Sequence, residues 1–453
     1  MTCVAALFVV WPPPASGDSP SGAPARGVWQ CSTDTRSHGV RLWWNEKRGS
    51  ESTVPDTFDR AGVPSYTFPV TDGRCATHPQ LVAYLARRIE DLRRRDRVLG
   101  LPAPAADTGM PATWGDPSRP DRRVVDGGSP ALDVYLDSTR ELAEGTATCV
   151  RWSPGQERGR SRTAAFVDLH NVRTFNQADL DRLVHNLAHE LVHVSQCAVT
   201  NRSGTVNGTT IDPRIVEASA EAFAVASSNT IDERLLGPAL SRPAAVLALN
   251  AASPPSDLMS YAQFPFWYEL FGAPSAKRYV GFLRSAVSAD TDQRHRSDAQ
   301  LVYKIFGESA VQRAITRFAS FVILGGDMGQ AHYDPVVSLI QPADLARLAP
   351  TAGSSASASE RLATGRYGYI TVTWPDSATA LTITAEGTTV QRAAESVAVG
   401  TRESGVVAPT DGSWTVTREC DPAGRCTGDG RAYISIADGR RSPLALRITA
   451  AAG

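Results

Sequence analysis

Two histidines separated by three residues are the part of this sequence best suited to chemistry, in the stretch His189-Glu190-Leu191-Val192-His193. Residues four apart on an α-helix lie about 6 Å from each other on one face, so two imidazoles there can bind one metal ion. Zinc binds imidazole nitrogen at about 2.1 Å and keeps one position for water in catalytic sites. Glu190 is turned about 100° away from His189, where its carboxylate can accept a proton from that water. The spacing predicts a catalytic zinc site; the alternative is a helix with two hydrogen-bonded histidines and a surface glutamate.

The residues around this motif predict that it lies on one helix, Gln177–Cys197. Apolar residues recur at alternating four- and three-residue steps and form one stripe; they are Leu180, Val184, Leu187, Leu191 and Val194. Asn176 is suited to cap the first turn. The histidines run along nearly the opposite side, where His185 either supports the metal site or lines the groove wall.

A second helix is predicted to begin at Asp212 and Pro213, because aspartate is a favoured N-cap and proline a favoured first helical residue. Glu217 and Glu221 then lie one turn apart on the same face. If Glu217 points at the metal, Glu221 is placed to accept the distal N–H of a ligand histidine. Such a carboxylate fixes the tautomer and the orientation of the imidazole.

Together these residues resemble the signature of the gluzincin metallopeptidases, the thermolysin-like group, in which HExxH is followed by a helix with Glu-x-x-x-Asp/Glu. The matching second stretch begins at Glu217, 24 residues after His193 (217 − 193 = 24). The resemblance covers about residues 160–230. It implies that Zn²⁺ is bound by His189, His193 and Glu217, that Glu190 is the general base, and that Glu221 supports a ligand from behind.

The resemblance also implies two further features of the site. Gluzincins carry a Tyr or His in the second lobe that hydrogen-bonds the developing oxyanion, and Tyr261 is our candidate, ahead of His295 and His332. They also place an edge strand above the metal, to which an extended substrate can add. Ala164–Leu169 is the candidate strand because it directly precedes the motif helix; the alternative is an ordinary core strand.

Other zinc-protease patterns are tested by the residues after the motif. The long metzincin form is excluded because Gln196 and Val199 stand where glycine and histidine are required. The stretch that ends in Asp212 has the Gly-Thr-x-x-Asp form of the aspzincins, in which the aspartate binds zinc. That group continues to a Tyr-Gly that is absent here, and Asp212 is also explained as a helix cap. We therefore favour Glu217 as the third ligand and keep Asp212 as the alternative.

Composition points to a soluble globular protein. A chain of 453 residues with 42% hydrophobic and 21% charged residues has ample material for a core and for two or three domains. The net charge of −1 gives no electrostatic reason to expect nucleic acid or an acidic membrane as a partner.

Export from the cell is predicted from the N-terminus and the cysteines. Residues 1–25 resemble a signal-like leader, with an apolar run that is too short to span a bilayer. Removal of Cys3 with this leader would leave six of the seven cysteines. Cys420 and Cys426 flank a turn-like loop and are expected to pair. The remaining four allow three pairings, of which the simplest are Cys31–Cys75 and Cys149–Cys197.

The predicted fold class is α+β, with a two-lobed zincin-like core and the active-site helix between the lobes. We expect an N-terminal α/β lobe at 26–175, the motif helix and a mainly helical lobe at 176–348, a flexible linker at 349–360 and an all-β sandwich at 361–453. The linker is predicted from its small residues, and the sandwich from the period-two pattern of several short segments.

The sequence therefore predicts a secreted zinc metallopeptidase that attacks a peptide or protein with a metal-bound water activated by Glu190. One alternative is a catalytically silent metal-containing protein that binds a cell surface or wall polymer through its C-terminal domain. The other is a hydrolase of a non-peptide amide bond. The retained Glu190 argues against a purely structural site, which needs no base.

Overall fold

The computed structural model describes a mixed α+β protein, over residues 31–37, 39–44, 80–103, 131–136, 145–152, 162–169, 177–200, 213–228, 230, 264–271, 276–292, 302, 304–324, 343–362, 366–375, 378–387, 395–401, 405–422, 426, 430–438 and 444–452. The chain divides into two compact units. The first comprises Met1–Asp232 and Pro274–Arg294, and the second Glu233–Ala273 and His295–Gly453. No helix within the described segments is both long and apolar enough to cross a membrane.

Five strands form the sheet of the first unit: β1 (Cys31–Asp34), β2 (Val40–Trp44), β3 (Leu132–Leu136), β4 (Gly145–Trp152) and β5 (Arg162–Leu169). Their spatial order is β1-β2-β3-β5-β4. β2, β3 and β5 run parallel, whereas β1 and β4 are antiparallel to their neighbours. Among the described strands, β4 therefore lies at one edge and pairs only with β5.

This order corrects one prediction about the sheet. The strand over Ala164–Leu169 exists as part of β5, but it is not an edge strand, because it pairs with β3 on one side and β4 on the other. Leu42, Val134 and Val167 lie side by side in register and are fully buried. Ala165, Phe166 and Val167 are consecutive and all buried, as is typical of an inner strand whose two faces are both covered.

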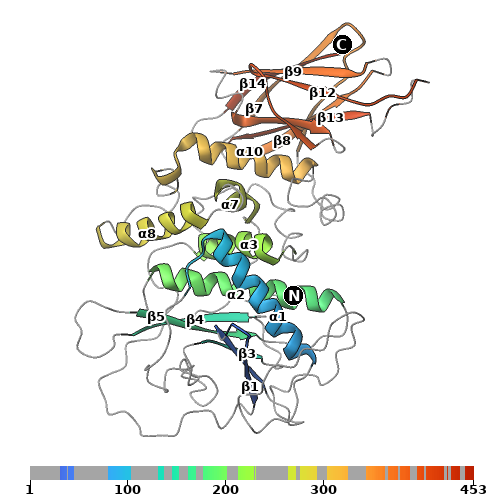
Figure 1. The fold of residues 1–453 in the computed structure, drawn as a ribbon. Coiled ribbons are helices and arrows are strands. Elements are labelled where there is room, and N and C mark those ends of the chain that lie inside the picture. Colours follow the sequence, from blue (N-terminus) through green and yellow to red (C-terminus); the bar gives the residue numbers. More distant parts are fainter. Residues whose placement is uncertain are drawn as a thin grey trace. The chain divides into compact units, whose positions relative to one another are not determined.

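Four of the described helices belong to the first unit: α1 (Gln80–Leu99), α2 (Gln177–Thr200), α3 (Pro213–Ser228) and α8 (Ala276–Asp292). α1 and α2 share one apolar core with the sheet, and α2 packs against β4 and β5 (Figure 1). α3 and α8 pack against α2. The predicted motif helix is confirmed and extends to Thr200, and α3 begins at Pro213 as predicted. The predicted apolar stripe of α2 is buried in the core.

A disulfide between Cys149 and Cys197 joins edge strand β4 to α2. Cys197 lies one helical turn beyond His193, so the bond holds the strand to the part of the helix that carries the motif. Closing a loop between residues 48 apart stabilises a fold by about 4 kcal/mol. A second disulfide joins Cys420 and Cys426. The Cys420–Cys426 pairing was predicted, and Cys149–Cys197 belongs to the simplest of the three pairings left open for the other four cysteines. Cys75 lies outside the described residues.

The second unit contains two sheets that pack face to face around one apolar core, as predicted for a β-sandwich. The first sheet has the order β11-β10-β13-β8-β6, formed by Gly405–Val407, Val397–Thr401, Arg431–Asp438, Arg366–Thr373 and Ala343–Leu348. The second has the order β12-β9-β14-β7, formed by Ser413–Thr417, Ala380–Glu386, Leu444–Ala452 and Ser355–Leu362. Helix α10 (Glu308–Leu324) packs on the first sheet, and α7 (Phe264–Phe271) packs on α10 (Figure 1).

The predicted flexible linker at 349–360 is wrong in its second half. Residues from Ser355 onward form strand β7, which pairs with β14 in an antiparallel register. Ala356 and Ala358 pack against the core of the sandwich. The small residues were interpreted by composition, but their alternation of serine and alanine has the period of a strand with one face buried. The sandwich therefore begins before residue 361, and it also includes β6.

The predicted boundary between lobes at 175 and 176 does not coincide with the division into two units. The motif helix α2 and helix α3 belong to the same unit as the N-terminal sheet. The reason is the apolar stripe of α2, since Leu187 and Leu191 share one core with Val167 of β5. The predicted leader at 1–25 lies outside the described residues.

Candidate metal centre

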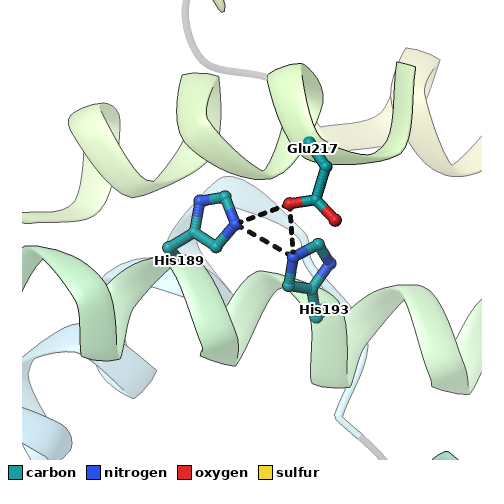
Figure 2. A group of neighbouring side chains, drawn as sticks. All are labelled: His189, His193 and Glu217. Carbon is teal, nitrogen blue, oxygen red and sulfur yellow. Dashed lines mark hydrogen bonds and ion pairs between the residues drawn. The ribbon is translucent and has the colours of Figure 1, made fainter. Parts of the chain in front are cut away.

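Helix α2 brings the two motif histidines together on the face opposite its apolar stripe. The Nε2 atoms of His189 and His193 lie 2.9 Å apart, and the two rings meet edge to face with centroids separated by 4.6 Å. Figure 2 shows both imidazoles rising from the same helix toward the neighbouring one. The i and i+4 spacing produces this arrangement, as predicted from the sequence.

Helix α3 supplies a carboxylate to the same point. Glu217 Oε2 lies 3.1 Å from His189 Nε2 and 3.2 Å from His193 Nε2 (Figure 2). The three side chains are buried, with 6% of His189, 3% of His193 and 6% of Glu217 exposed. Together they form a group that could hold a metal ion.

The other nitrogen of each imidazole has its own partner. His189 Nδ1 lies 3.1 Å from Glu221 Oε2, and His193 Nδ1 lies 2.7 Å from Gln196 Oε1. A carboxylate and an amide oxygen accept hydrogen bonds, so each Nδ1 carries a hydrogen and each Nε2 of a neutral imidazole presents a lone pair. Glu217 also presents only lone pairs. Three lone-pair atoms within 3.2 Å of one another repel unless a cation lies among them.

The spacing of these atoms suits a small divalent ion. Two ligands at about 2.1 Å from a tetrahedral zinc ion lie about 3.4 Å apart. The three distances between the ligand atoms are 2.9, 3.1 and 3.2 Å, which are slightly shorter. Binding of a zinc ion would require the three side chains to move apart by only a few tenths of an ångström. The three residues therefore fit such an ion.

The buried carboxylates give the site a negative charge. Burial raises the pKa of Glu217, but the two imidazoles of His193 and His189 outweigh it and hold this pKa well below its usual range. Burial also raises the pKa of Glu221, but His185 and His189 outweigh it and hold this pKa below its usual range. Buried charges require compensation. A divalent cation would balance the two negative charges of Glu217 and Glu221.

The same carboxylates favour protonated imidazoles when no metal is present. Burial lowers the pKa of His189, but the hydrogen bonds and charges of Glu217 and Glu221 raise it to about 10. The pKa of His193 is also raised, since Glu217 outweighs the effect of burial. The site therefore attracts positive charge, which is a proton on the imidazoles when no metal is present and a metal ion when one is bound.

Glu190, the predicted base, lies on α2 beside the edge strand. A Cβ atom built on Gly145 of β4 would lie 2.9 Å from Glu190 Cγ and 3.0 Å from its Oε1. Glu190 is 6% exposed, and its charge is one of the influences that raise the pKa of His193. Its carboxylate therefore lies between the ligand helix and the first residue of β4.

A layer of polar residues behind the ligands was only partly predicted. Glu221 was predicted to support a ligand, and its Oε2 accepts the hydrogen bond from His189. Its Oε1 is 2.7 Å from His185 Nε2, so His185 supports the site rather than lining a groove wall. Gln196 was missed, although its position one turn after His193 was a usable signal. Tyr279 of α8, which contacts Gln196, had no such signal because 83 residues separate the two.

Several candidate residues cannot be placed. Tyr261, the predicted oxyanion-stabilising residue, lies outside the described residues, as do His295 and His332. The competing ligand Asp212 also lies outside them.

Comparison with known proteins adds no assignment to this geometry. No protein-family model, no curated protein and no solved structure gives a significant match to this chain.

Proposed function

We propose that this chain is a secreted zinc-dependent peptide hydrolase with a gluzincin-like site. The observation that carries the proposal is the convergence of His189, His193 and Glu217 on one point, with Nε2 and Oε2 lone pairs facing each other. Glu190, on the same helix as the two histidines and beside Gly145 of an edge strand, adds a base and a place for an extended substrate. The two-lobed zincin-like arrangement is part of this proposal.

Zinc is the metal that we propose from the chemistry of the ligands. Two imidazoles and one carboxylate form a borderline set of nitrogen and oxygen donors, which suits zinc better than magnesium or calcium. Catalytic zinc sites have three protein ligands and one position for water, whereas structural sites have four protein ligands. Within the described part of the chain, His189, His193 and Glu217 are the three candidate ligands, which is the number typical of a catalytic site.

Each residue of the site has a separate role in the proposed reaction. His189, His193 and Glu217 would hold the ion, which when bound lowers the pKa of water from 15.7 to about 7 and polarises a carbonyl. Glu190 would accept a proton from the attacking water and deliver it to the leaving amine. Glu221 and Gln196 keep the hydrogens of the two imidazoles on Nδ1, so that both Nε2 atoms stay available.

The substrate would bind along β4 rather than β5. β4 is the edge strand of the described sheet, and its first residue, Gly145, lies against Glu190. An extended peptide can add to such an edge through main-chain hydrogen bonds. A scissile carbonyl near Gly145 would then lie close to the base.

Secretion is proposed from the disulfides. Cys149–Cys197 and Cys420–Cys426 are both formed, one in each unit. Structural disulfides persist in oxidising compartments such as the cell exterior. Contact with a cell surface or wall polymer through the β-sandwich remains part of the alternative function.

A hydrolysis assay with a matched variant tests the proposal. Purified wild type and Glu190→Gln would be incubated with casein and with cell-wall polymer, with zinc and after treatment with a chelator. We expect wild type to cleave casein, the chelator to abolish cleavage and zinc to restore it. Glu190→Gln should retain zinc but turn over at least about 100-fold more slowly.

Two results would contradict the peptide-hydrolase proposal. A zinc-loaded wild type that cleaves neither material would favour the silent binding protein. Cleavage of the wall polymer without cleavage of casein would favour a hydrolase of a non-peptide amide bond.

A further inference from the structure

Behind His193 lies a buried chain of hydrogen bonds that reaches a third helix. Gln196 donates through Nε2 to Tyr279 Oη at 2.6 Å and to the carbonyl oxygen of Val216 at 3.1 Å. Tyr279 Oη also lies 2.9 Å from Ser219 Oγ. Gln196, Ser219 and Tyr279 are fully buried and come from α2, α3 and α8.

The direction of this chain is fixed by its chemistry. Ser219 Oγ donates to the carbonyl oxygen of Val216 at 3.1 Å, and a carbonyl can only accept. The single hydroxyl hydrogen of Ser219 is thus used, so Tyr279 donates to Ser219 and accepts from Gln196. Both amide hydrogens of Gln196 then point away from the metal centre, toward Tyr279 and Val216.

This orientation decides which nitrogen of His193 faces the metal centre. With both amide hydrogens engaged, Gln196 presents Oε1 to His193 Nδ1 at 2.7 Å. An oxygen there requires a hydrogen on Nδ1, which leaves the lone pair on Nε2. A rotated amide would instead present hydrogens to Nδ1 and move the imidazole hydrogen to Nε2, where it would block a metal ion.

We propose that Tyr279 is a positioning residue of the metal centre, which holds Gln196 in the orientation that keeps His193 Nε2 available. The inference rests on the proposed metal site, because only a metal ion needs that lone pair. Tyr279 also joins the two ligand-bearing helices, since its hydroxyl bonds to Gln196 of α2 and to Ser219 of α3. Ser219 lies between Glu217 and Glu221 in the sequence.

Removal of the phenol oxygen should weaken metal binding. Tyr279→Phe keeps the ring, which packs on Phe223 with centroids 4.9 Å apart, but removes the acceptor of one Gln196 hydrogen. The amide nitrogen then keeps only the Val216 carbonyl as an acceptor, so the orientation of the amide is held less firmly. Changes to groups behind metal ligands weaken affinity by about 10- to 100-fold, and we expect a loss in this range. Ser219→Ala, which removes the acceptor of the Tyr279 hydrogen, should produce a smaller loss in the same direction.

A control on the same helix separates positioning from general stability. Phe282 lies three residues after Tyr279 and is also fully buried. Phe282→Leu should lower the stability of the unit through lost packing, yet it should leave metal affinity within a factor of about 3, because no polar bond behind His193 changes.

The experiment measures metal binding and needs no substrate. Zinc affinity would be obtained by competition with a chelator, and the absorption spectrum of the cobalt(II) form would report the ligand geometry. We expect weaker zinc binding and an altered cobalt spectrum for Tyr279→Phe, but wild-type values for Phe282→Leu. Wild-type affinity and spectrum in Tyr279→Phe, or an equal loss in Phe282→Leu, would overturn the role of Tyr279 alone. A wild type that binds neither metal would overturn the metal centre and this inference with it.

Discussion

At the scale of single residues, Gly145 is the position where the smallest change should have a large effect. A Cβ atom there would approach Glu190 Cγ to 2.9 Å, closer than van der Waals contact allows. Glu190 is buried on α2, so its carboxylate has little room to move without leaving its position beside the metal centre. The absence of a side chain at Gly145 is therefore a requirement of the proposed base.

We predict that Gly145→Ala displaces Glu190 and lowers kcat by about 100-fold, since a shift of about 1 Å in a catalytic group can have this effect. Zinc content should not change, because the three heavy atoms nearest to the added Cβ all belong to Glu190 and none to a proposed metal ligand. Gly281→Ala is a suitable control, as nothing lies within 4 Å of its added Cβ. Steady-state kinetics with parallel zinc analysis measures both effects. Wild-type turnover in Gly145→Ala would contradict the assignment of Glu190.

Sequence reasoning was strongest for residues whose partners lie one helical turn away. The i and i+4 spacing predicted the pairs His189–His193 and Glu217–Glu221, and the gluzincin resemblance implied that the two pairs meet. The structure brings all four residues together. Tyr279 reaches Gln196 from a helix 83 residues further along the chain. No periodicity within a helix encodes a contact of that range, so the sequence could not predict it.

At the scale of elements, the C-terminal end of α1 contains a buried carboxyl group. Gly100 has a φ of 89°, and the amides of Gly100 and Leu101 bond back to Arg97 and Asp96 in the pattern of a Schellman cap. The side chain of Asp96 is buried at this end of the helix. Burial, which exceeds the opposing effect of Arg93 and Arg97, raises the pKa of Asp96 to about 7.

We predict that ionisation of Asp96 destabilises the fold as the pH rises. The folded state keeps the proton up to about pH 7, whereas the unfolded state releases it near the ordinary value of 3.8, so stability falls between these values. Between pH 5 and pH 8 this loss amounts to about 3 kcal/mol. The Asp96→Asn variant should not show this loss of stability. Urea unfolding at pH 5 and pH 8 measures the loss in both proteins.

Asp91→Asn provides the matched control on the same helix. Asp91 is a partly exposed carboxylate that pairs with Arg94, and the neutral variant should follow the wild-type dependence on pH. An Asp96→Asn protein with an unchanged dependence would show that Asp96 does not titrate in this range.

The sequence did not predict the order of the strands in the first sheet, although it did predict some of the strands themselves. The strand predicted over Ala164–Leu169 lies within β5. β4 was not predicted, and its position at the edge depends on pairing with β5. Such pairing is set by tertiary structure, because periodicity identifies a buried face but not a neighbour. β7 was missed because composition was given more weight than alternation.

At the scale of the whole molecule, the three proposed metal ligands all belong to one of the two units. α2 and α3 lie in the first unit, and the β-sandwich lies in the second. A ligand that binds only the folded state stabilises the unit that contains its site, by about 2.7 kcal/mol at a free concentration of 100 times its Kd. Metal removal should therefore affect the two units unequally.

We predict that a chelator lowers the melting temperature of the first unit by several degrees. The transition of the β-sandwich should not move, because its disulfide and its core do not involve the metal ligands. Differential scanning calorimetry with and without a chelator measures both transitions, and added zinc should restore the first. Equal shifts of both transitions, or no shift, would contradict the placement of the metal in α2 and α3.

At this scale the sequence predicted the mixed α+β class. The β-sandwich was predicted from the period-two pattern of several short segments, and two sheets around one apolar core lie in that part of the chain. The Cys420–Cys426 disulfide was also predicted, from the loop between the two cysteines, whereas Cys149–Cys197 belongs to the simplest of the three pairings that the sequence left open. The division into two units was not predicted, because it depends on which helices cover the first sheet.

The central claim is that two imidazoles and one carboxylate meet at a single divalent ion, and calorimetric titration of the metal-free protein with zinc tests it most directly. We predict one zinc ion per wild-type chain, affinity weakened by more than about 100-fold in Glu217→Ala, and unchanged binding in Asp212→Ala. No zinc binding by wild type, or a loss in Asp212→Ala but not in Glu217→Ala, would contradict the account.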